Sequence, residues 1–191
     1  MPYDRGRYQD KWRLERVASR ARERLGLSQA DILDPWSLAE AIPAHVLYPD
    51  DFGDPSLAAR LRFVDWDGGA FVFPDEKTLI VILNPAKSRR RQLATLLEEL
   101  SHHLLSHTPS RIYQDSATGL LRRNFNPAQE AEAFDFGSVL LLPKELIQHH
   151  VKVVRGTAAD LADKCGCSVD LVELRIKRCR LWNRYQTTCV V

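Results

Sequence analysis

Apolar residues recur at three- and four-residue steps over several stretches of the chain, as they do along amphipathic helices. The clearest example starts at Trp12 and ends at Leu25, where Gly26 closes the pattern. Asp34 and Ser88 stand where helix N-caps are expected. The spacing predicts helices over residues 10–26, 36–41, 88–105 and 127–142, with a further helix from about residue 144.

Shorter apolar runs between the second and third of these helices predict strands. Residues 70–73 and 79–83 read as a hairpin around 74–77, and residues 45–48 as another short strand. Residues 61–66 alternate loosely, Asp67-Gly68-Gly69 marks a turn, and residues 107–126 read as a polar loop. We therefore expect an α+β fold in which helices pack on a small antiparallel sheet.

The last part of the chain, from Gly156 to about Tyr185, reads as two short helices split at Cys165-Gly166-Cys167. This arrangement is typical of a helix-turn-helix unit. DNA binding would require its basic residues on one exposed face, and a packing pair with a solvated basic side is the simpler interpretation. We expect a main domain over residues 1–150 and a helical tail over 151–191, and DNA binding by the tail is not the favoured interpretation.

Composition narrows the class of protein. The chain has 191 residues, a net charge of +2 and 45% hydrophobic residues, which suits one compact domain and gives no sign of a nucleic-acid partner. No apolar run approaches the roughly 20 residues of a membrane helix, and the polar N-terminus lacks a signal core. The four cysteines cluster near the end, in spacing that fits free thiols better than a zinc knot. A cytoplasmic protein is expected.

The segment Thr95–His103 carries the strongest chemical signal. It has the frame E-E-x-x-H, in which Glu98 and His102 lie one helical turn apart and face the same way. A carboxylate and an imidazole so placed can share a divalent cation, and Glu99 then stands where the H-E-x-x-H motif carries its general base. Alternatives are an ordinary surface helix, or a shifted site built on His103 and His107.

Two acidic residues about thirty positions downstream are candidates for a further ligand. Glu130 and Glu132 are two residues apart, so they face roughly 200° apart on a helix, and only one can reach the site. The residues alone leave that choice open.

These segments together resemble the ImmA/IrrE-type metallopeptidases. The resemblance rests on Leu83-Asn84-Pro85, on Gln92 through Leu105, and on Glu132-Ala133-Phe134-Asp135-Phe136 through Leu141-Leu142-Pro143. It implies that Glu99 is the catalytic base and that His102 and Glu132 are metal ligands, with Glu130 as the fallback. Glu98 occupies the position of the family's first histidine ligand, and Ser101 replaces a glycine.

The resemblance also implies a zincin-like metallopeptidase domain over residues 1–150, and a function. We expect a regulatory zinc-type endopeptidase, with zinc, manganese or another divalent metal, that cuts a helix-turn-helix transcriptional repressor controlling a stress, mobile-element or toxin–antitoxin operon. Because Glu98 replaces an imidazole, the sequence leaves a second hypothesis open. In it the site holds no metal, and the fold serves as a protein-binding regulatory module without catalysis.

Overall fold

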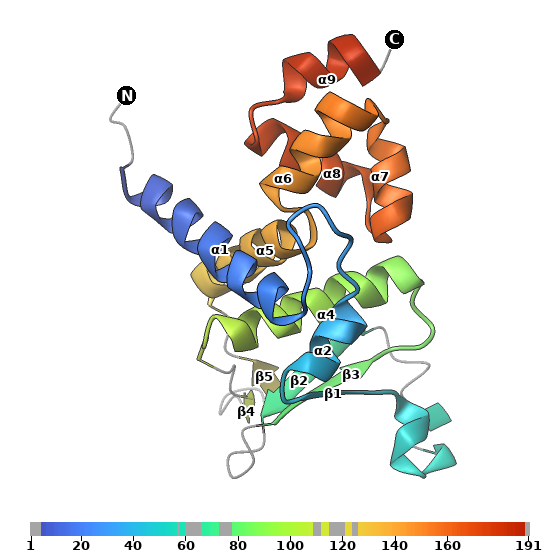
Figure 1. The fold of residues 1–191 in the computed structure, drawn as a ribbon. Coiled ribbons are helices and arrows are strands. Elements are labelled where there is room, and N and C mark those ends of the chain that lie inside the picture. Colours follow the sequence, from blue (N-terminus) through green and yellow to red (C-terminus); the bar gives the residue numbers. More distant parts are fainter. Residues whose placement is uncertain are drawn as a thin grey trace.

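The computed structural model describes residues 5–56, 58–59, 66–72, 78–108, 112–114, 121–123 and 126–189. A small sheet forms one end of the molecule, the long helix α4 (Arg89–Leu104) lies across it, and short helices form the opposite end (Figure 1). The predicted α+β, zincin-like class is confirmed.

The sheet at this end is mixed. In the described residues its strand order is β1-β3-β2, with β1 (Ala44–Leu47) parallel to β3 (Leu79–Leu83) and β2 (Gly68–Val72) antiparallel to it. The predicted pairing of these two segments is confirmed for the described residues 70–72, which pair with 79–81, and residue 73 lies outside the described residues. A wholly antiparallel sheet was the wrong expectation for β1. As the central strand, β3 is an almost continuous buried apolar run. The predicted turn at 74–77 and most of the loosely alternating stretch 61–66 lie outside the described residues.

Gly68 and Gly69 belong to β2, not to the turn that the sequence predicted. The reason is a close approach of α4 to the strand. A Cβ atom on Gly68 would lie 2.7 Å from Thr95 Cγ2 and 2.8 Å from the carbonyl oxygen of Ile82. The glycine therefore marks contact between the sheet and the helix that carries the candidate site.

Both predicted helix caps are present. The Asp34 side chain accepts hydrogen bonds from the N–H groups of Trp36 and Ser37 at the start of α2 (Pro35–Ala41), and Ser88 accepts from Arg91 at the start of α4. Leu96 and Leu100, on the inner face of α4, are fully buried. A short 3-10 helix, η1 (Pro49–Phe52), follows β1.

Two further helices, α1 (Arg5–Arg24) and α5 (Pro127–Leu141), pack against each other, and α5 also packs against α4. The buried Arg22 joins α1 to the end of α5, because its guanidinium donates to the Leu140 carbonyl at 2.9 Å and to the Ser28 carbonyl at 3.0 Å. This contact fixes the position of α5 relative to the rest of the core.

The predicted polar loop at 107–126 contains a second, antiparallel pair of strands, β4 (Ile112–Gln114) and β5 (Leu121–Arg123). Each is three residues long, so the apolar positions they supply are too few to stand out in a polar stretch.

The last helices pack on the core. They are α6 (Lys144–His149), the π-helical η2 (His150–Val154), α7 (Ala158–Cys165), α8 (Val169–Arg178) and α9 (Trp182–Cys189). The predicted pair is α7 and α8, and α9 is an addition. The buried Arg175 on α8 donates to the Leu142 carbonyl at 2.9 Å and pairs with Glu15 on α1 at 3.2 Å. The expected domain boundary at 150 falls where α6 passes directly into η2.

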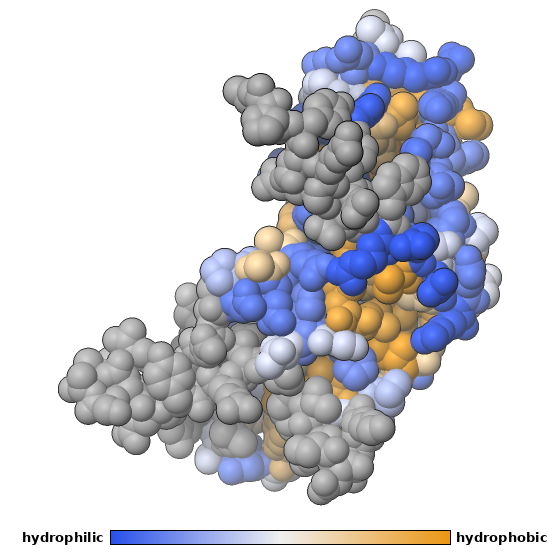
Figure 2. Space-filling model, turned by 90° about the vertical axis from the view of Figure 1, so that its left-hand side faces the viewer, coloured by the Kyte–Doolittle hydropathy of each residue, from blue (hydrophilic) through white to orange (hydrophobic). Residues whose placement is uncertain are grey.

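All four cysteines are free thiols. Among the described helices, none is long and apolar enough to cross a membrane. One face of the molecule shows an apolar area bordered by hydrophilic residues (Figure 2).

Candidate metal centre

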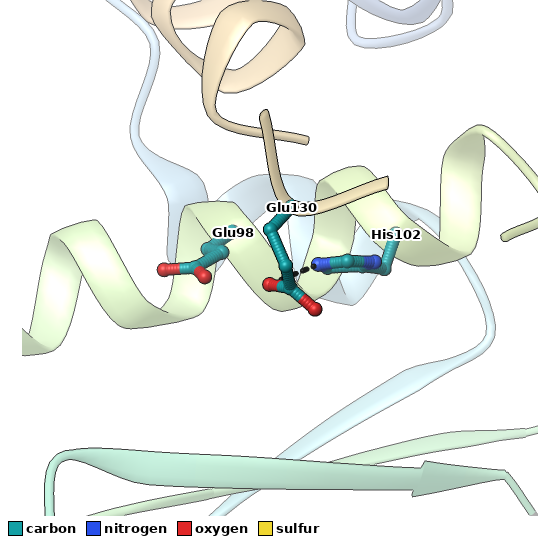
Figure 3. A group of neighbouring side chains, drawn as sticks. All are labelled: Glu98, His102 and Glu130. Atoms are coloured by element: carbon teal, nitrogen blue, oxygen red, sulfur yellow. Dashed lines mark ion pairs between the residues drawn. The ribbon is translucent and has the colours of Figure 1, made fainter. Parts of the chain in front are cut away.

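Three side chains from α4 and α5 meet at the surface of α4. Glu98 and His102 project from successive turns of α4, and Glu130 reaches between them from the first turns of α5 (Figure 3). His102 Nε2 lies 3.3 Å from Glu130 Oε2. His102 and Glu130 are half-buried, whereas Glu98 is exposed. The group therefore has a protected side and a side that a ligand can approach.

The geometry of this group fits a divalent cation. One possible ligand atom from each residue lies within 4.8 Å of the others. In a tetrahedral site with metal–ligand bonds of roughly 2.1 Å, ligand atoms are about 3.4 Å apart. The two glutamate side chains have rotatable bonds through which their oxygens can approach the imidazole more closely.

The close packing of α5 on α4 explains why Glu130 reaches the site. Ala133 is fully buried, and a Cβ atom on Gly137 would lie 3.0 Å from Ser101 Oγ. Glu130, Ala133 and Gly137 follow one another at steps of three and four residues, so they share one helix face. The two small residues let the helices approach, and Glu130 continues the same face by one more turn.

The carboxylate of Glu98 is electrostatically disfavoured in the metal-free protein. Desolvation by surrounding protein atoms raises its pKa, and the negative charge of Glu130 raises it further, while His102 and Arg91 act in the opposite direction. A divalent cation between the two carboxylates would remove the repulsion. Crowded carboxylates of this kind are a feature of functional sites.

Glu132 takes part in a different set of contacts. It forms an ion pair with Arg13 of α1, and its Oε2 lies 3.0 Å from His107 Nε2. The other side of His107 faces the metal group, since His107 Nδ1 lies 3.0 Å from His102 Nδ1. The His107 side chain is only 6% exposed, and desolvation, together with His102 and Arg13, lowers its pKa.

The backbone at the end of α4 brings the two imidazoles together. The N–H of His107 donates to the His102 carbonyl at 2.9 Å, and the N–H of Ser106 donates to the His103 carbonyl at 3.0 Å, with Ser106 in the left-handed region at φ 55°. This is the Schellman motif, in which the first and last residues of the closed turn make a side-chain contact that is usually hydrophobic. Here that contact joins two histidines, whose ring centroids are 4.9 Å apart.

Glu99 is half-buried and directly follows Glu98 on α4. His103, one turn beyond Glu99, is also half-buried, and desolvation lowers its pKa. In the described structure, the group of side chains that could hold a metal consists of Glu98, His102 and Glu130. His103 and His107, the residues of the alternative site, are not members of that group.

Comparison with known families agrees with the motif. A family model described as the IrrE N-terminal-like domain matches residues 57–177, well over half of the chain. The chain belongs to the ImmA/IrrE-type metallopeptidase family. The match to this family begins before β2 and ends within α8, so it takes in α4, α5 and part of the tail. No curated protein matches the chain.

Within this metallopeptidase-like fold, the structure groups predicted residues Glu98 and His102 with Glu130, which the sequence suggested only as a fallback, and places Glu132 with His107 and Arg13. The assignment of Glu132 as a metal ligand stays a prediction, and the geometry favours Glu130. The sequence signal that favours Glu130 is its position on one helix face with the small residues Ala133 and Gly137. Local spacing in the sequence does not indicate that Glu132 connects His107 to Arg13.

Proposed function

We propose that this protein is a divalent-metal-dependent peptidase in which Glu98, His102 and Glu130 hold the cation and Glu99 is the catalytic base. The observation that carries the proposal is the convergence of the three side chains from two helices on one small volume. Membership of a metallopeptidase family supports the same chemistry.

The donor set also indicates which metals would bind. Two carboxylates and one imidazole form a harder set than the two imidazoles and one carboxylate of a thermolysin-type zinc site. Oxygen donors favour cations such as Mn²⁺, and the two negative charges would neutralise a dication. Zinc and manganese are therefore the ions to compare.

In the proposed reaction, a bound cation would polarise the peptide carbonyl and acidify a water molecule. The Glu99 carboxylate would accept a proton from the water as its oxygen attacks the carbonyl carbon. When the C–N bond breaks, Glu99 would return the proton to the departing amine. The products would be a carboxylate and a free amino terminus, and Glu99 would be regenerated.

A groove beside the candidate metal centre supports a peptide as substrate. It has a volume of about 540 Å³ and runs between α4, α5 and α8. Ala94, one turn before Glu98, and Phe134, one turn after Glu130, both line it. Phe134 is 50% exposed, and Leu97, Leu171 and Leu174 add apolar surface. Apolar side chains of a bound peptide would be accommodated there, next to the site of cleavage.

We further propose a helix-turn-helix transcriptional repressor as the substrate, which would make the protein a regulator of transcription. The test is to incubate the protein, loaded with Mn²⁺ or Zn²⁺, with such repressors from the same genome. Cleavage at one peptide bond is the expected result. Glu99→Gln should abolish cleavage while metal binding remains, and a repressor cut equally by Glu99→Gln would refute the catalytic role.

A second function is favoured by one specific observation, the carboxylate of Glu98 at the position of the family's first histidine ligand. The protein would then bind a repressor without cutting it. In that case wild type and Glu99→Gln would bind the repressor with equal affinity, and neither would produce fragments with any metal.

A further inference from the structure

Four contacts connect the candidate metal centre to the N-terminal helix. These contacts join Glu130 to His102, His102 to His107, His107 to Glu132, and Glu132 to Arg13 on α1. Glu130 belongs to the candidate centre, and His107, Glu132 and Arg13 lie behind it. None of these three is explained by the proposed reaction.

We infer that His107, Glu132 and Arg13 are positioning residues that hold the His102 imidazole with its proton on Nδ1 and its Nε2 lone pair directed toward Glu98 and Glu130. The relay is the series of contacts from Arg13 through Glu132 and His107 to His102, and these contacts lie within the protein. Its consequence for metal binding rests on the function proposed above.

The donor and the acceptor of each hydrogen bond in the relay follow from its Glu132 end. Arg13 forms an ion pair with the Glu132 carboxylate, and a carboxylate can only accept a hydrogen bond. His107 must therefore carry its proton on Nε2, which lies 3.0 Å from Glu132 Oε2. In a neutral imidazole the other nitrogen is an acceptor, so His107 Nδ1 accepts from His102 Nδ1 at 3.0 Å. His102 Nε2 is then unprotonated, the form that a metal requires, and its distance of 3.3 Å from Glu130 Oε2 is a separation between two ligand atoms, not a hydrogen bond.

The relay is built into the fold. The Schellman motif at the end of α4 fixes the backbone of His107 relative to that of His102. Glu132 lies two residues after Glu130, roughly 200° around α5, so different faces of one helix serve the metal group and its support. Arg13 lies before residues 57–177, the part that matches the family model. The N-terminal helix of this chain thus contributes to the site from outside the matched region.

The direct test is the tautomer of His102 in the metal-free protein, read from long-range ¹⁵N–¹H spectra of the ring nitrogens at mildly alkaline pH. Wild type should show a protonated Nδ1 and an unprotonated Nε2. His107→Phe, which keeps a planar ring but removes the acceptor, should shift the population toward protonated Nε2. His107→Gln, whose amide oxygen can accept, should restore part of the wild-type signal.

The second readout is affinity for Mn²⁺ and Zn²⁺, measured by competition with a chromogenic chelator. Loss of a hydrogen-bonding partner of a ligating histidine typically weakens metal binding by roughly 10–100-fold. His107→Phe should show a loss of that size, and Glu132→Gln a loss toward its lower end, because an amide oxygen can still accept from His107. Asp135→Asn is the matched control on α5, because Asp135 pairs with Arg178 away from the site, and it should bind metal as wild type does.

A wild-type His102 protonated on Nε2, or a tautomer that His107→Phe leaves unchanged, would overturn the inference. Equal metal affinity in wild type and His107→Phe would overturn the positioning role. If wild type binds neither metal, the proposed function fails, and the tautomer measurement still decides whether the relay exists. Thermal melts of each variant by circular dichroism separate these results from misfolding.

Discussion

Glu130 Oε2 lies 3.3 Å from His102 Nε2, although the two residues come from different helices and are separated by a polar segment with its own pair of strands. This contact depends on the close approach of α5 to α4 at Gly137. It turns an E-E-x-x-H sequence, which is common by itself, into a group of two carboxylates and one imidazole around a shared volume.

The choice between Glu130 and Glu132 as the third ligand is testable with one conservative change at each position. Glu130→Gln should lose metal affinity by more than the roughly 10–100-fold typical of residues that only support a ligand. Glu132→Gln should stay within that range because its carboxylate contacts His107 and Arg13. Titration of each apo-protein with Mn²⁺ and Zn²⁺ gives both values, and the reverse ranking would restore Glu132 as the ligand.

Glu98→His should convert the donor set to two imidazoles and one carboxylate. Zinc affinity should rise relative to manganese, because imidazole is a softer ligand than carboxylate. The measurement is the ratio of the two dissociation constants in wild type and variant. The account would be contradicted by an unchanged ratio, since Glu98 would then not touch the metal.

The raised pKa of Glu98 predicts a pH-dependent effect on stability in the metal-free protein. Folding favours the protonated carboxyl, so its contribution to stability is present below the ordinary pKa of 4.5 and is lost as the pH rises through the raised value. Glu98→Gln should therefore melt at a higher temperature than wild type near neutral pH and at the same temperature in acid.

Saturating Mn²⁺ should reverse that ranking at neutral pH. The metal stabilises only the folded protein that binds it, and Glu98→Gln would bind it less tightly. Melting curves with and without metal across this pH range provide the check. A variant less stable than wild type without metal would show that desolvation and repulsion do not act on Glu98 as described.

Ser106→Gly should stabilise the protein by about 0.5–1 kcal/mol. Ser106 has φ 55°, where a side chain is strained, and glycine relieves the strain at some cost in unfolded-state entropy. Ser106→Val should be destabilising for the same reason. Urea denaturation of the metal-free proteins measures both changes, and a loss of stability in Ser106→Gly would contradict the assigned strain.

Helix caps, the β2–β3 pairing and the E-E-x-x-H helix could be predicted because each depends on neighbours in sequence. Asp34 and Ser88 cap helices through bonds to residues two or three positions away. Gly68 was misassigned to a turn because its role depends on Thr95, which lies on another element. Local spacing carries no information about such an approach.

The candidate site also combines residues that local spacing predicts with residues that only the tertiary packing brings together. Glu98 and His102 are fixed by helical spacing, whereas the choice of Glu130 over Glu132 depends on which face of α5 meets α4. Arg13 is more than a hundred residues from Glu132 in sequence, and only the packing of α1 on α5 brings them together.

The central claim is that Glu98, His102 and Glu130 bind a divalent metal. Elemental analysis of the purified protein, before and after loading with Mn²⁺ or Zn²⁺, tests it most directly. We predict a single divalent ion per chain in wild type and its loss in His102→Ala, with the fold retained. A wild-type protein that takes up neither metal, or a His102→Ala variant that binds as much as wild type, would contradict the account.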